Sequence, residues 1–530
     1  MNVLTSLERA ALHRPDELAV RKDGVALTYR ELFDTAARFA GHLVREGLRP
    51  GERVGIYLHN ELAWLPALLG IWRAGGVAVP FNYLFAPAAL RHAAADSGAR
   101  WVLALATDVP RLRDTLQGTE AGDRIVSIGA AGGSGVTGGV AGAAGDAAGA
   151  GGGAVPGAVC SFKEAVAGAP LERTVPRMDG DDALLMYTSG STGRPKGVRQ
   201  THRNTTAACE AVIDTWRFGP ADHALICTPL FHVGGLQLMA LPLLLAGGSA
   251  TLRRWQPREW LDDVLALRPS YVALVPAMLI DIVNLLGERE TVLDSVRVCA
   301  VGGSAMPAAR LGQFTALTGI VPVNIYGQTE QSGLSVTEPI NADRRPGSLG
   351  RPLDQVVQWQ LVPAGATEPL PPRCGDVGEL WVRGDAVTPG YWRLPEVNAA
   401  KFTAEGWLRT GDLVREQADG YLYYLERTDD MIISGGENVY PQTVEGHLQE
   451  CPLIAEVTVI GTAHERLVEQ VTAIVVPSAP DVTAEHIAAF CQSRPDLRGL
   501  QRPRRIELVD EIPRTATNKV DRPALRRRFP

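Results

Sequence analysis

The sequence has few cysteines, no excess of basic residues and no long apolar run, and each shortage excludes a class of protein. Its seven cysteines are odd in number and stand singly in apolar surroundings, as in Ile226-Cys227 and Val298-Cys299. This pattern argues against a disulfide framework or a zinc site, and it predicts buried thiols in a reducing, cytoplasmic compartment. The formal net charge of −7 offers no attraction for DNA or RNA, so no nucleic-acid partner is expected.

The longest apolar stretch runs from Leu236 to Ala246 and contains Pro242. It is too short to span a bilayer. Residues 1–9 include acidic and basic side chains where a signal peptide needs an apolar core. We therefore expect a soluble protein without a transmembrane segment.

At 530 residues the chain is too long for one ordinary core, which predicts at least two domains. The first part alternates helical and strand patterns. Thr28 and Glu31 are spaced as a capping box, a helix with one apolar face follows and ends at Gly47, and residues 54–58 form a strand. Repeats of this kind predict a layered α/β domain.

Residues 129–158 interrupt that pattern with little besides glycine, alanine, valine and serine. Such a segment buries too little apolar surface to offset its ordering entropy, so it is predicted to be a flexible surface insertion. The alternative is a segment that becomes ordered on a partner.

After Asp429 the composition and the rhythm change. A helix is expected to begin within residues 438–441, residues 457–460 and 471–476 have the pattern of paired strands, and residues 482–491 have that of a helix. About a hundred residues of this kind are typical of a small α+β domain.

Residues 187–198 form the sequence Tyr-Thr-Ser-Gly-Ser-Thr-Gly-Arg-Pro-Lys-Gly-Val, in which glycines, hydroxyls and Lys196 suit the oxygens of a phosphate. It is not the Walker loop, because Pro195 precedes the lysine and Gly197 follows it. An apolar strand at 183–187 leads into the loop, and a helix is expected from Thr201. A plain surface loop is the alternative; a nucleoside triphosphate site is the prediction.

Other motifs follow in order along the chain: Pro229 to Gly235, Tyr326 to Glu330, Thr410 to Asp412, Arg427 to Asp429, and Pro513 to Lys519. With the glycine-rich loop, this ordered set closely resembles the adenylate-forming superfamily, which contains acyl-CoA synthetases, aryl-CoA ligases, nonribosomal adenylation domains and beetle luciferases. The resemblance covers Leu27 to Lys519. One departure is Asn518, where the family usually has glycine before the lysine; asparagine tolerates left-handed backbone, so the loop is expected to survive.

The resemblance implies an α/β fold with a large layered N-terminal adenylation domain, residues 1–428, and a small mobile α+β lid, residues 429–530, hinged at Asp429. It also implies an ATP and AMP site in which Tyr326 stacks on adenine and Asp412 accepts hydrogen bonds from the ribose. The full nucleotide set is Thr188, Ser189, Gly190, Ser191, Thr192, Gly193, Lys196, Gly303, Ser304, Asn324, Tyr326, Gly327, Thr329, Asp412 and Arg427. Mg²⁺ is assigned to Thr188 and Glu330, which offer oxygen ligands.

Lys519 is the implied catalytic group that bridges the attacking carboxylate and the α-phosphate, with His232 and Arg427 as further catalytic candidates. The implied substrate pocket comprises Phe231, His232, Gln237, Gly302, Gln331 and Ser332. Gln237, Gln331 and Ser332 indicate some polarity near the substrate, although a solvated loop would have the same residues. The alternative for His232 is a histidine buried in the core. The resemblance also implies that Gly435 and Gly436 border the CoA tunnel.

These assignments predict an AMP-forming ligase that uses ATP, Mg²⁺ and CoA: a fatty or aromatic carboxylate attacks ATP, pyrophosphate leaves, and the acyl group passes to the CoA thiol. Alternatives keep the adenylation step and change the acceptor or the oxyanion, as in carrier-protein loading, an adenylate oxidase, or nitrite activation with amine ligation in secondary metabolism. Amino-acid activation is disfavoured, because His232 stands where such relatives have aspartate. A non-catalytic nucleotide sensor would lack Lys519 or Glu330, and both are present. The particular carboxylate and the oligomeric state, with a homodimer as one option, stay open.

Overall fold

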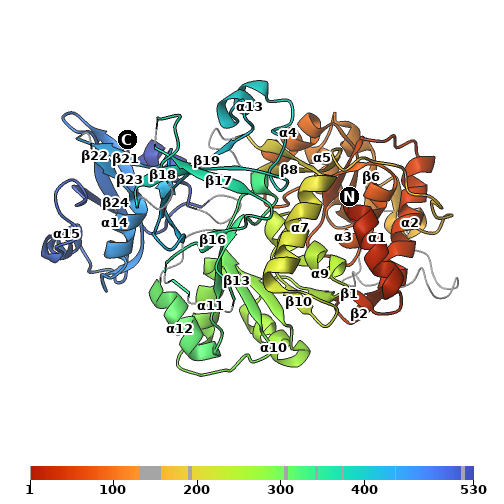
Figure 1. Cartoon of the computed structure of the whole chain (residues 1–530), viewed down its shortest axis with the longest axis horizontal. Helices are drawn as coiled ribbons and strands as arrows, with labels where there is room; N and C mark the ends of the chain where they lie inside the picture. The colour runs from red at the N-terminus through yellow and green to blue at the C-terminus, as the bar shows by residue number, and fades with distance from the viewer. Residues whose placement is uncertain are drawn as a thin grey trace. The chain divides into compact units, whose positions relative to one another are not determined.

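The computed structural model describes residues 2–129, 157–188, 194–303, 308–340, 344–345, 347–363, 365–371, 375–435, 437–514 and 520–530. The chain divides into two compact units (Figure 1). Unit 1 comprises Met1–Pro346, Gly350–Gln358 and Arg383–Gly406; unit 2 comprises Gly347–Leu349, Trp359–Val382 and Trp407–Pro530. This mixed α/β architecture, with a large N-terminal and a small C-terminal part, confirms the predicted fold class.

Two largely parallel sheets form the framework of unit 1. Among the described residues the first has the order β7-β6-β5-β3-β4-β8-β9, and only the β8–β9 pair is antiparallel. Its strands are β3 (Arg53–Tyr57), β4 (Val77–Pro80), β5 (Ala99–Leu105), β6 (Ile125–Ile128), β7 (Cys160–Ser161), β8 (Asp182–Thr188) and β9 (Lys196–Thr201). Buried parallel strands of this kind are near-continuous apolar runs, and all four residues of β4 are buried.

The second sheet has the order β16-β15-β14-β13-β12-β10-β11-β1-β2 within the same described ranges, with antiparallel pairs only at its two edges. Its strands are β1 (Leu18–Lys22), β2 (Val25–Thr28), β10 (His223–Ile226), β11 (Ser249–Leu252), β12 (Tyr271–Leu274), β13 (Val298–Gly302), β14 (Val323–Tyr326), β15 (Val336–Thr337) and β16 (Arg351–Pro352).

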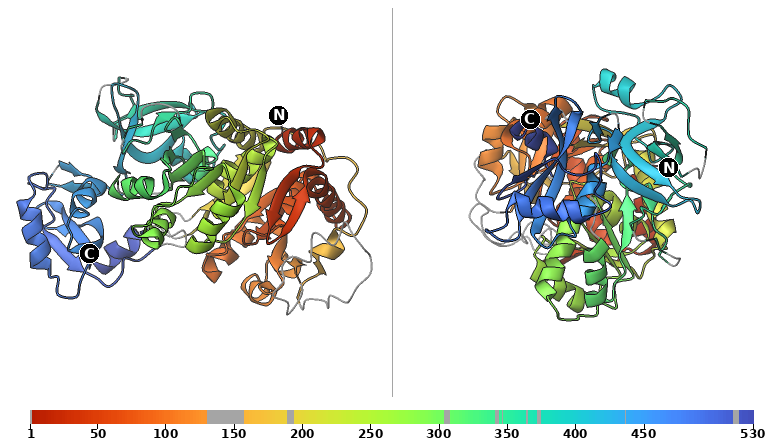
Figure 2. Two further views of the ribbon diagram at one scale, coloured as in Figure 1. Left: turned by 90° about the horizontal axis from the view of Figure 1, so that it is seen from below. Right: turned by 90° about the vertical axis from the view of Figure 1, so that its left-hand side faces the viewer.

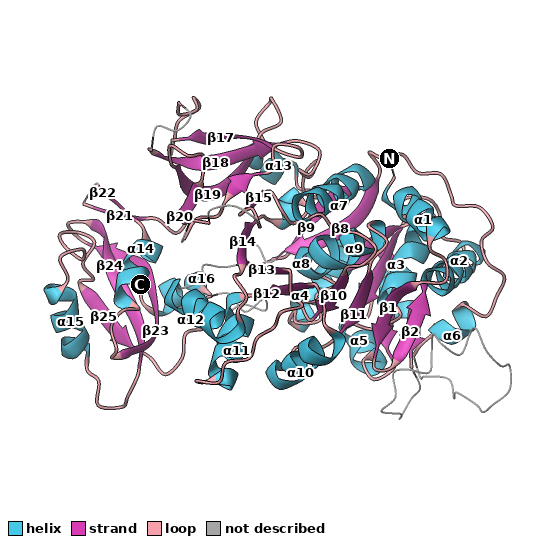
Figure 3. Ribbon diagram, turned by 60° about the horizontal axis from the view of Figure 1, so that its bottom comes forward, coloured by secondary structure: helices cyan, strands magenta, loops and turns pink. Residues whose placement is uncertain are grey.

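Helices pack along both sheets (Figures 2 and 3). They are α1 (Val3–His13), α2 (Tyr29–Arg45), α3 (Trp64–Arg73), α4 (Pro87–Ser97), α5 (Val109–Thr115), α6 (Phe162–Ala165), α7 (His202–Trp216), α8 (Val233–Gly235), α9 (Leu241–Leu245), α10 (Pro257–Leu267), α11 (Pro276–Leu286), α12 (Ala308–Thr318) and α13 (Pro395–Lys401), with short turns η1 (Glu120–Asp123), η4 (Leu236–Ala240) and η5 (Thr329–Gln331). One core cluster joins Trp260, Ile282 and Phe314 of the helices to Val272 and Val301 of the strands. Burial of such apolar side chains is the main force that holds helices on the sheet.

The predicted helix after Thr28 is confirmed as α2. Thr28 accepts a hydrogen bond from the Glu31 amide, and the Glu31 carboxylate accepts one from the Thr28 amide, so the capping box is complete. Leu32, Phe39 and Leu43 of its apolar face are fully buried. The predicted strand at 54–58 is β3.

The expected order of strand, loop and helix at residues 183–201 is wrong in one element. The predicted strand is β8, but the chain then returns as β9 before α7 begins at His202. The return strand contains Lys196, Arg199 and Gln200, and its polarity concealed it from a search for apolar runs.

Unit 2 contains two smaller sheets. One has the order β17 (Gln358–Val362), β18 (Val377–Arg383), β19 (Leu408–Glu416) and β20 (Leu422–Arg427). The other has the order β22-β21-β24-β23, with β25 paired to β24; its strands are β21 (Ile432–Ser434), β22 (Glu437–Val439), β23 (Ile454–His464), β24 (Val468–Pro477) and β25 (Arg505–Leu508). Helices α14 (Pro441–Leu448), α15 (Ala484–Ser493) and α16 (Arg522–Arg528) complete the unit.

The strands predicted at 457–460 and 471–476 lie in β23 and β24 and pair as expected, and the predicted helices are α14 and α15. The sheet of β17 to β20 was not predicted. The predicted domain boundary between residues 428 and 429 is a point of rotation between two conformations. The two compact units are defined by contacts within one conformation. The boundary therefore stays a prediction. In the part of the chain that is described, no helix has the length and apolarity needed to cross a membrane.

Candidate active site

The glycine-rich loop is held at the end of the β8–β9 hairpin. All five residues from Ala183 to Tyr187 are buried, so β8 is a fixed support. Thr188 and Lys196 face each other in the antiparallel register, which brings the predicted hydroxyl and lysine to the mouth of the loop. The loop residues Ser189, Gly190, Ser191, Thr192 and Gly193 lie outside the described residues.

Helix α4 anchors this hairpin from one side. The Tyr187 hydroxyl donates to the Asp96 carboxylate at 2.6 Å, and burial raises the pKa of that hydroxyl well above its usual value. The Trp392 ring nitrogen donates to the Asp96 carbonyl oxygen at 3.0 Å, and Nε2 of His92 lies 3.2 Å from the Pro195 carbonyl oxygen. A hairpin held by several partly buried hydrogen bonds is a rigid base for a phosphate-binding loop.

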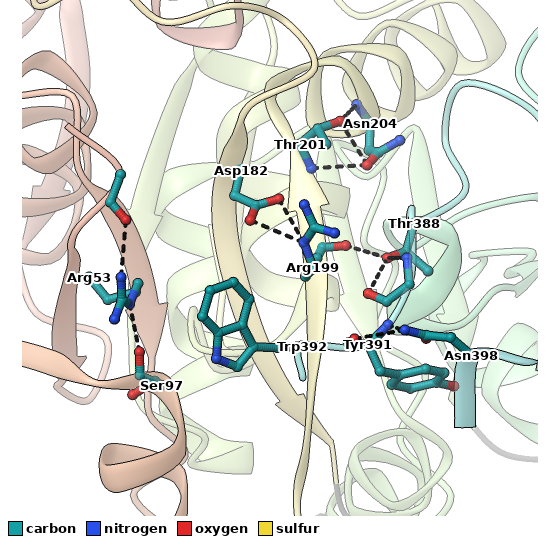
Figure 4. Close-up of polar contacts among 12 residues, drawn as sticks. Arg53, Ser97, Asp182, Arg199, Thr201, Asn204, Thr388, Tyr391, Trp392 and Asn398 are labelled. Atoms are coloured by element: carbon teal, nitrogen blue, oxygen red, sulfur yellow. Dashed lines mark hydrogen bonds and ion pairs between the residues drawn. The ribbon is translucent and has the colours of Figure 1, made fainter. Parts of the chain in front are cut away.

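A segment from Asp385 to Asn398 runs beside β9 (Figure 4). The Trp392 amide donates to the Gly197 carbonyl at 2.7 Å, and the Arg199 amide donates to the Gly390 carbonyl at 3.1 Å. The Thr388 hydroxyl donates to the Arg199 carbonyl oxygen. The segment therefore adds a short extended stretch to the edge of the seven-stranded sheet.

Asn204 ties the same segment to helix α7. Its Oδ1 accepts hydrogen bonds from the Thr201 amide and hydroxyl, which caps the first turn of the helix (Figure 4). Its Nδ2 donates to the carbonyl oxygens of Asp385 and Val387 at 2.7 and 2.9 Å. One buried amide thus satisfies both a helix end and a neighbouring segment.

Glu330, the predicted metal ligand, is reached by this network. The Tyr391 hydroxyl donates to Oε1 of Glu330 at 2.7 Å, and the Thr388 amide donates to its carbonyl oxygen at 2.8 Å. Nε2 of Gln200 donates to the Thr329 carbonyl at 2.7 Å. The hairpin of Thr188 and Lys196 and the motif of Thr329 and Glu330 are therefore joined by hydrogen bonds.

Two predicted site glycines are required by close backbone approach. A Cβ at Gly302 would lie 2.6 Å from the Ile325 carbonyl oxygen, and one at Gly327 would lie 1.9 Å from the Gly333 carbonyl oxygen. Both positions follow or end neighbouring parallel strands, β13 and β14. The glycines let the chain turn closely at the carboxyl ends of these strands, where open α/β sheets bind ligands.

The remaining nucleotide candidates of unit 1 lie at the same strand ends. Asn324 and Tyr326 belong to β14, and Gly303 directly follows β13. The Asn324 amide donates to a Glu338 carboxylate oxygen at 3.0 Å. Ser304 lies outside the described residues.

The predicted substrate side contains buried polar groups on a π-helical turn. Gln237 lies on η4, a π-helix, and only 1% of it is exposed. A Cβ at Gly333 would lie 4.0 Å from Cβ of Gln237, so the turn lies beside the segment after Glu330. Gln331 and Ser332 of that segment are buried too. π-turns occur frequently at functional sites.

Three of these side chains have a polar atom without a hydrogen-bond partner among the described residues: Oε1 of Gln237, Nε2 of Gln331 and Oγ of Ser332. Nε2 of Gln237 donates to the Thr205 hydroxyl at 3.4 Å, and the Ser335 hydroxyl donates to Oε1 of Gln331. Each amide is therefore oriented by its second polar atom.

His232 is exposed, so the alternative of a core histidine does not apply. Its Nδ1 accepts a hydrogen bond from the Gly234 amide at 3.1 Å and caps α8. Its neighbour Phe231 packs edge-on against Tyr83, with ring centroids 4.9 Å apart, and Tyr83 packs against His59 at 3.9 Å. Burial lowers the pKa of His59 below its usual value, and the charge of Arg254 lowers it further. Sequence analysis missed Tyr83 and His59, which belong to no recognised motif.

Unit 2 contains the predicted ribose residues. Asp412 of β19 and Arg427 of β20 are paired in register, and Nη1 of Arg427 lies 2.9 Å from Oδ1 of Asp412. Asp412 is 3% exposed, so its carboxylate is oriented by this ion pair. The predicted hinge residue Asp429 follows β20 and is exposed, and the Gly435 amide donates to the Leu467 carbonyl at 2.9 Å. Gly436 and Lys519 lie outside the described residues.

Two family models match the chain: "AMP-binding enzyme" over residues 7–392 and "AMP-binding enzyme C-terminal domain" over residues 443–519. A feruloyl-CoA synthase from Amycolatopsis sp is 34% identical over 524 residues, which cover 98% of each chain. A long-chain-fatty-acid–CoA ligase of Escherichia coli O157:H7 is 30% identical over 99% of this chain and 94% of its own. The crystal structure of ATP-bound MatB from Rhodopseudomonas palustris superposes with a TM-score of 0.87 at 28% identity, and covers 100% of this chain and 99% of that one.

The chain therefore belongs to the AMP-binding enzyme family, the adenylate-forming enzymes. It is an AMP-forming acid–thiol ligase that activates a carboxylate with ATP, releases pyrophosphate and transfers the acyl group to CoA. The Glu330 carboxylate and the Thr188 hydroxyl are hard oxygen donors that fit Mg²⁺. Bound with ATP, that ion would neutralise phosphate charge as pyrophosphate leaves.

Proposed function

We propose that the carboxylate this enzyme activates is an aromatic acid that carries a hydroxyl or a similar polar group. The observation that supports this most directly is the buried, unpartnered Oε1 of Gln237. A buried polar atom without a partner costs about 1–3 kcal/mol. The hydrocarbon chain of a fatty acid has no hydrogen-bond donor, so it would leave Oε1 of Gln237 without a partner.

The unpartnered atoms complement a hydroxyl. Oε1 of Gln237 accepts a hydrogen bond, Nε2 of Gln331 donates one, and Oγ of Ser332 does either. A hydroxyl both donates and accepts, so it satisfies a mixed set of this kind. The Tyr83–Phe231 pair offers an aromatic surface for a ring. The similarity to the feruloyl-CoA synthase from Amycolatopsis sp also supports an aromatic acid.

The same proposal gives this chain's residues their roles. Residues 188–193 and Lys196 hold the phosphates of ATP, Tyr326 stacks on adenine, and Asp412 orients the ribose. Lys519 neutralises charge between the attacking carboxylate and the α-phosphate, which is the main requirement of this step. Glu330, oriented by Tyr391 at 2.7 Å, would hold Mg²⁺ together with Thr188.

The second half-reaction needs a thiol in place of pyrophosphate. We propose that residues 429–530 rotate about Asp429 between the two steps, and that Gly435 and Gly436 then border the path of CoA. One small domain can present two faces in turn, because a hinge absorbs the change in a few backbone angles.

Pyrophosphate release with a panel of acids tests the substrate class. Hydroxycinnamates, cinnamate without the hydroxyl, and fatty acids are compared with and without CoA. We expect kcat/KM for the hydroxylated acid to exceed that for its unsubstituted analogue about 10- to 100-fold, since a lost buried hydrogen bond is worth about 1–3 kcal/mol. Equal values for the two acids, or a preference for fatty acids, would contradict the proposal.

A pair of variants connects the preference to the proposed residue. Gln237→Leu should lower the ratio between the two acids, whereas Gln313→Leu, an exposed position on α12, should leave it unchanged. An unchanged ratio in Gln237→Leu would assign the selectivity elsewhere.

We further propose that the enzyme acts in the cytoplasm and that no carrier protein is needed for the transfer to CoA. Six cysteines of the described residues are free thiols, which supports a reducing compartment. A phosphopantetheinylated carrier, nitrite and an arylamine are included as competing acceptors or oxyanions in the same assay. Light scattering of the purified chain decides between a monomer and a homodimer.

A further inference from the structure

Two arginines of helix α16 contact carboxylates of β20, of the segment after it and of α14. Nη2 of Arg522 lies 2.9 Å from Oε1 of Glu445, and its Nη1 lies 3.6 Å from Oδ2 of Asp430 and 4.0 Å from Oε1 of Glu426. Nη2 of Arg526 lies 3.1 Å from Oδ1 of Asp430. Two guanidinium groups thus meet three carboxylates. We call these five residues the arginine latch.

The latch includes both sides of Asp429, the proposed hinge residue. Glu426 precedes Asp429, whereas Asp430, Glu445 and both arginines follow it. If residues 429–530 rotate as one body, Arg522 keeps its contacts with Glu445 and Asp430. The contact between Arg522 and Glu426 is the one that must change.

Glu426 also caps a helix across the same point. Its Oε2 accepts a hydrogen bond from the Gln442 amide at 3.2 Å, in the first turn of α14, and its Oε1 accepts one from the Arg427 amide at 2.9 Å. A carboxylate is favourable there, because the first amides of a helix lack intrahelical partners and carry a positive partial charge. Rotation about Asp429 would separate Glu426 from the α14 amide as well.

These contacts are buried, so their loss is costly. The Glu426 side chain is fully buried and that of Arg522 is 15% exposed. Without Arg522 and the Gln442 amide, the buried Glu426 carboxylate would keep the Arg427 amide alone among these contacts, whereas Arg522 would keep Glu445 and Asp430. A buried carboxylate that loses its cationic partner is strongly destabilising. Glu445 is additionally held by the Thr458 hydroxyl and the Val459 amide at 2.9 and 2.7 Å, so it is a fixed support for Arg522.

We propose that Glu426 and Arg522 are positioning residues for the two-step reaction: their contact, with the Gln442 cap, stabilises the hinge conformation seen here relative to the conformation that serves the other half-reaction. This inference rests on the proposed rotation about Asp429. Neither residue needs to touch a substrate. Their effect acts through the orientation of the C-terminal segment.

The test measures the two half-reactions separately in the full chain. Adenylate formation is followed as pyrophosphate release in a single turnover without CoA, and thioester formation is followed from presynthesised adenylate with CoA. In Glu426→Gln we expect the ratio of the two rates to change at least about 5-fold, because one conformer loses a stabilising contact and the other does not. Arg522→Lys should change the ratio in the same direction.

Glu465→Gln, an exposed position in the β23–β24 turn, is the matched control and should leave the ratio unchanged. Equal loss of both rates in Glu426→Gln and Arg522→Lys would show a merely structural role and overturn the proposal, as would an unchanged ratio. Should Glu426→Gln fail to fold, Arg522→Lys with thermal unfolding as a folding check still decides. Wild-type chain that forms no adenylate with any acid of the panel would contradict the proposed function, whereas active wild type with an unchanged ratio in the variants contradicts the latch alone.

Discussion

At the scale of single residues, burial without full compensation marks the positions with most consequence. Oε1 of Gln237 and Nε2 of Gln331 are buried without partners among the described residues, and Glu426 is a fully buried carboxylate. A buried polar atom costs about 1–3 kcal/mol unless a ligand or a protein group satisfies it. One of these groups is assigned here to substrate recognition and another to positioning.

Glu426 also predicts a dependence of stability on pH. Burial raises the pKa of Glu426 to about 7, and Glu445 and Asp430 add to the increase while Arg522 and the Arg427 amide oppose it. Between about pH 4.5, the ordinary value, and pH 7 the folded chain binds the proton more tightly than the unfolded chain. Its contribution to stability is therefore present at low pH and is lost as pH rises through 7, by at most roughly 3 kcal/mol.

The measurement is the difference in unfolding free energy between wild type and Glu426→Gln at several pH values from 4.5 to 8. The difference should vary with pH for Glu426→Gln and stay flat for Glu465→Gln, which serves as the exposed control. Parallel profiles for Glu426→Gln and wild type would show that Glu426 titrates normally.

At the scale of elements, the close approach of the β14 end to the turn after η5 shapes the nucleotide side. A Cβ at Gly327 would lie 1.9 Å from a backbone oxygen, which cannot move without displacing the turn. Gly327→Ala should therefore destabilise unit 1 by about 1–3 kcal/mol and raise the KM for ATP. Gly312→Ala on α12 is the matched control, because a Cβ there meets nothing within 4 Å and alanine favours a helix.

Thermal unfolding and ATP-dependent pyrophosphate release measure the two effects. Gly312→Ala should be neutral or slightly stabilising. Similar stability for both variants would mean that the turn after η5 relaxes easily and that the glycine is not required.

At the scale of the whole molecule, the glycine- and alanine-rich insertion should be replaceable. Residues 130–156 lie outside the described residues, but the strands on both sides are described. β6 and β7 are parallel neighbours, and the Val159 amide donates to the Ile125 carbonyl at 2.8 Å. Val159 pairs with Ile125, three residues before Ile128, so at roughly 3.3 Å per residue the two ends lie about 10 Å apart. A single peptide bond between Ile128 and Val159 could not span that distance.

We therefore expect that replacement of residues 129–158 by a short Gly/Ser linker of about six residues keeps kcat/KM within about 2-fold of wild type, while direct deletion loses β7. Activity and thermal unfolding of the two shortened chains check this. A collapse of the linker variant would show that the insertion contributes to folding or catalysis.

Local patterns predicted a good part of the fold. The capping box of Thr28 and Glu31 and the apolar strands β8, β23 and β24 were predicted correctly, because caps and apolar periodicity depend on neighbours in the sequence. β9 and the sheet of β17 to β20 were missed. Their strands mix polar and apolar residues without a clear pattern. Such a segment is recognised as a strand only when the neighbouring strand that it pairs with is known.

The class of chemistry could be read from the order of the motifs along the chain. The glycine-rich loop with Lys196 predicts a phosphate site from its residue types, and its order with the Thr329-Glu330 pair and the motif that ends at Lys519 carries the resemblance to adenylate-forming enzymes. The groups that support these motifs are apparent in the folded chain and not in the sequence. Tyr391 meets Glu330 from 61 positions away and Arg522 meets Glu445 from 77, and no local pattern reports contacts over such separations. Whether Gln237 is a solvated or a buried amide was likewise decided by packing, because burial depends on what the rest of the chain places around a side chain.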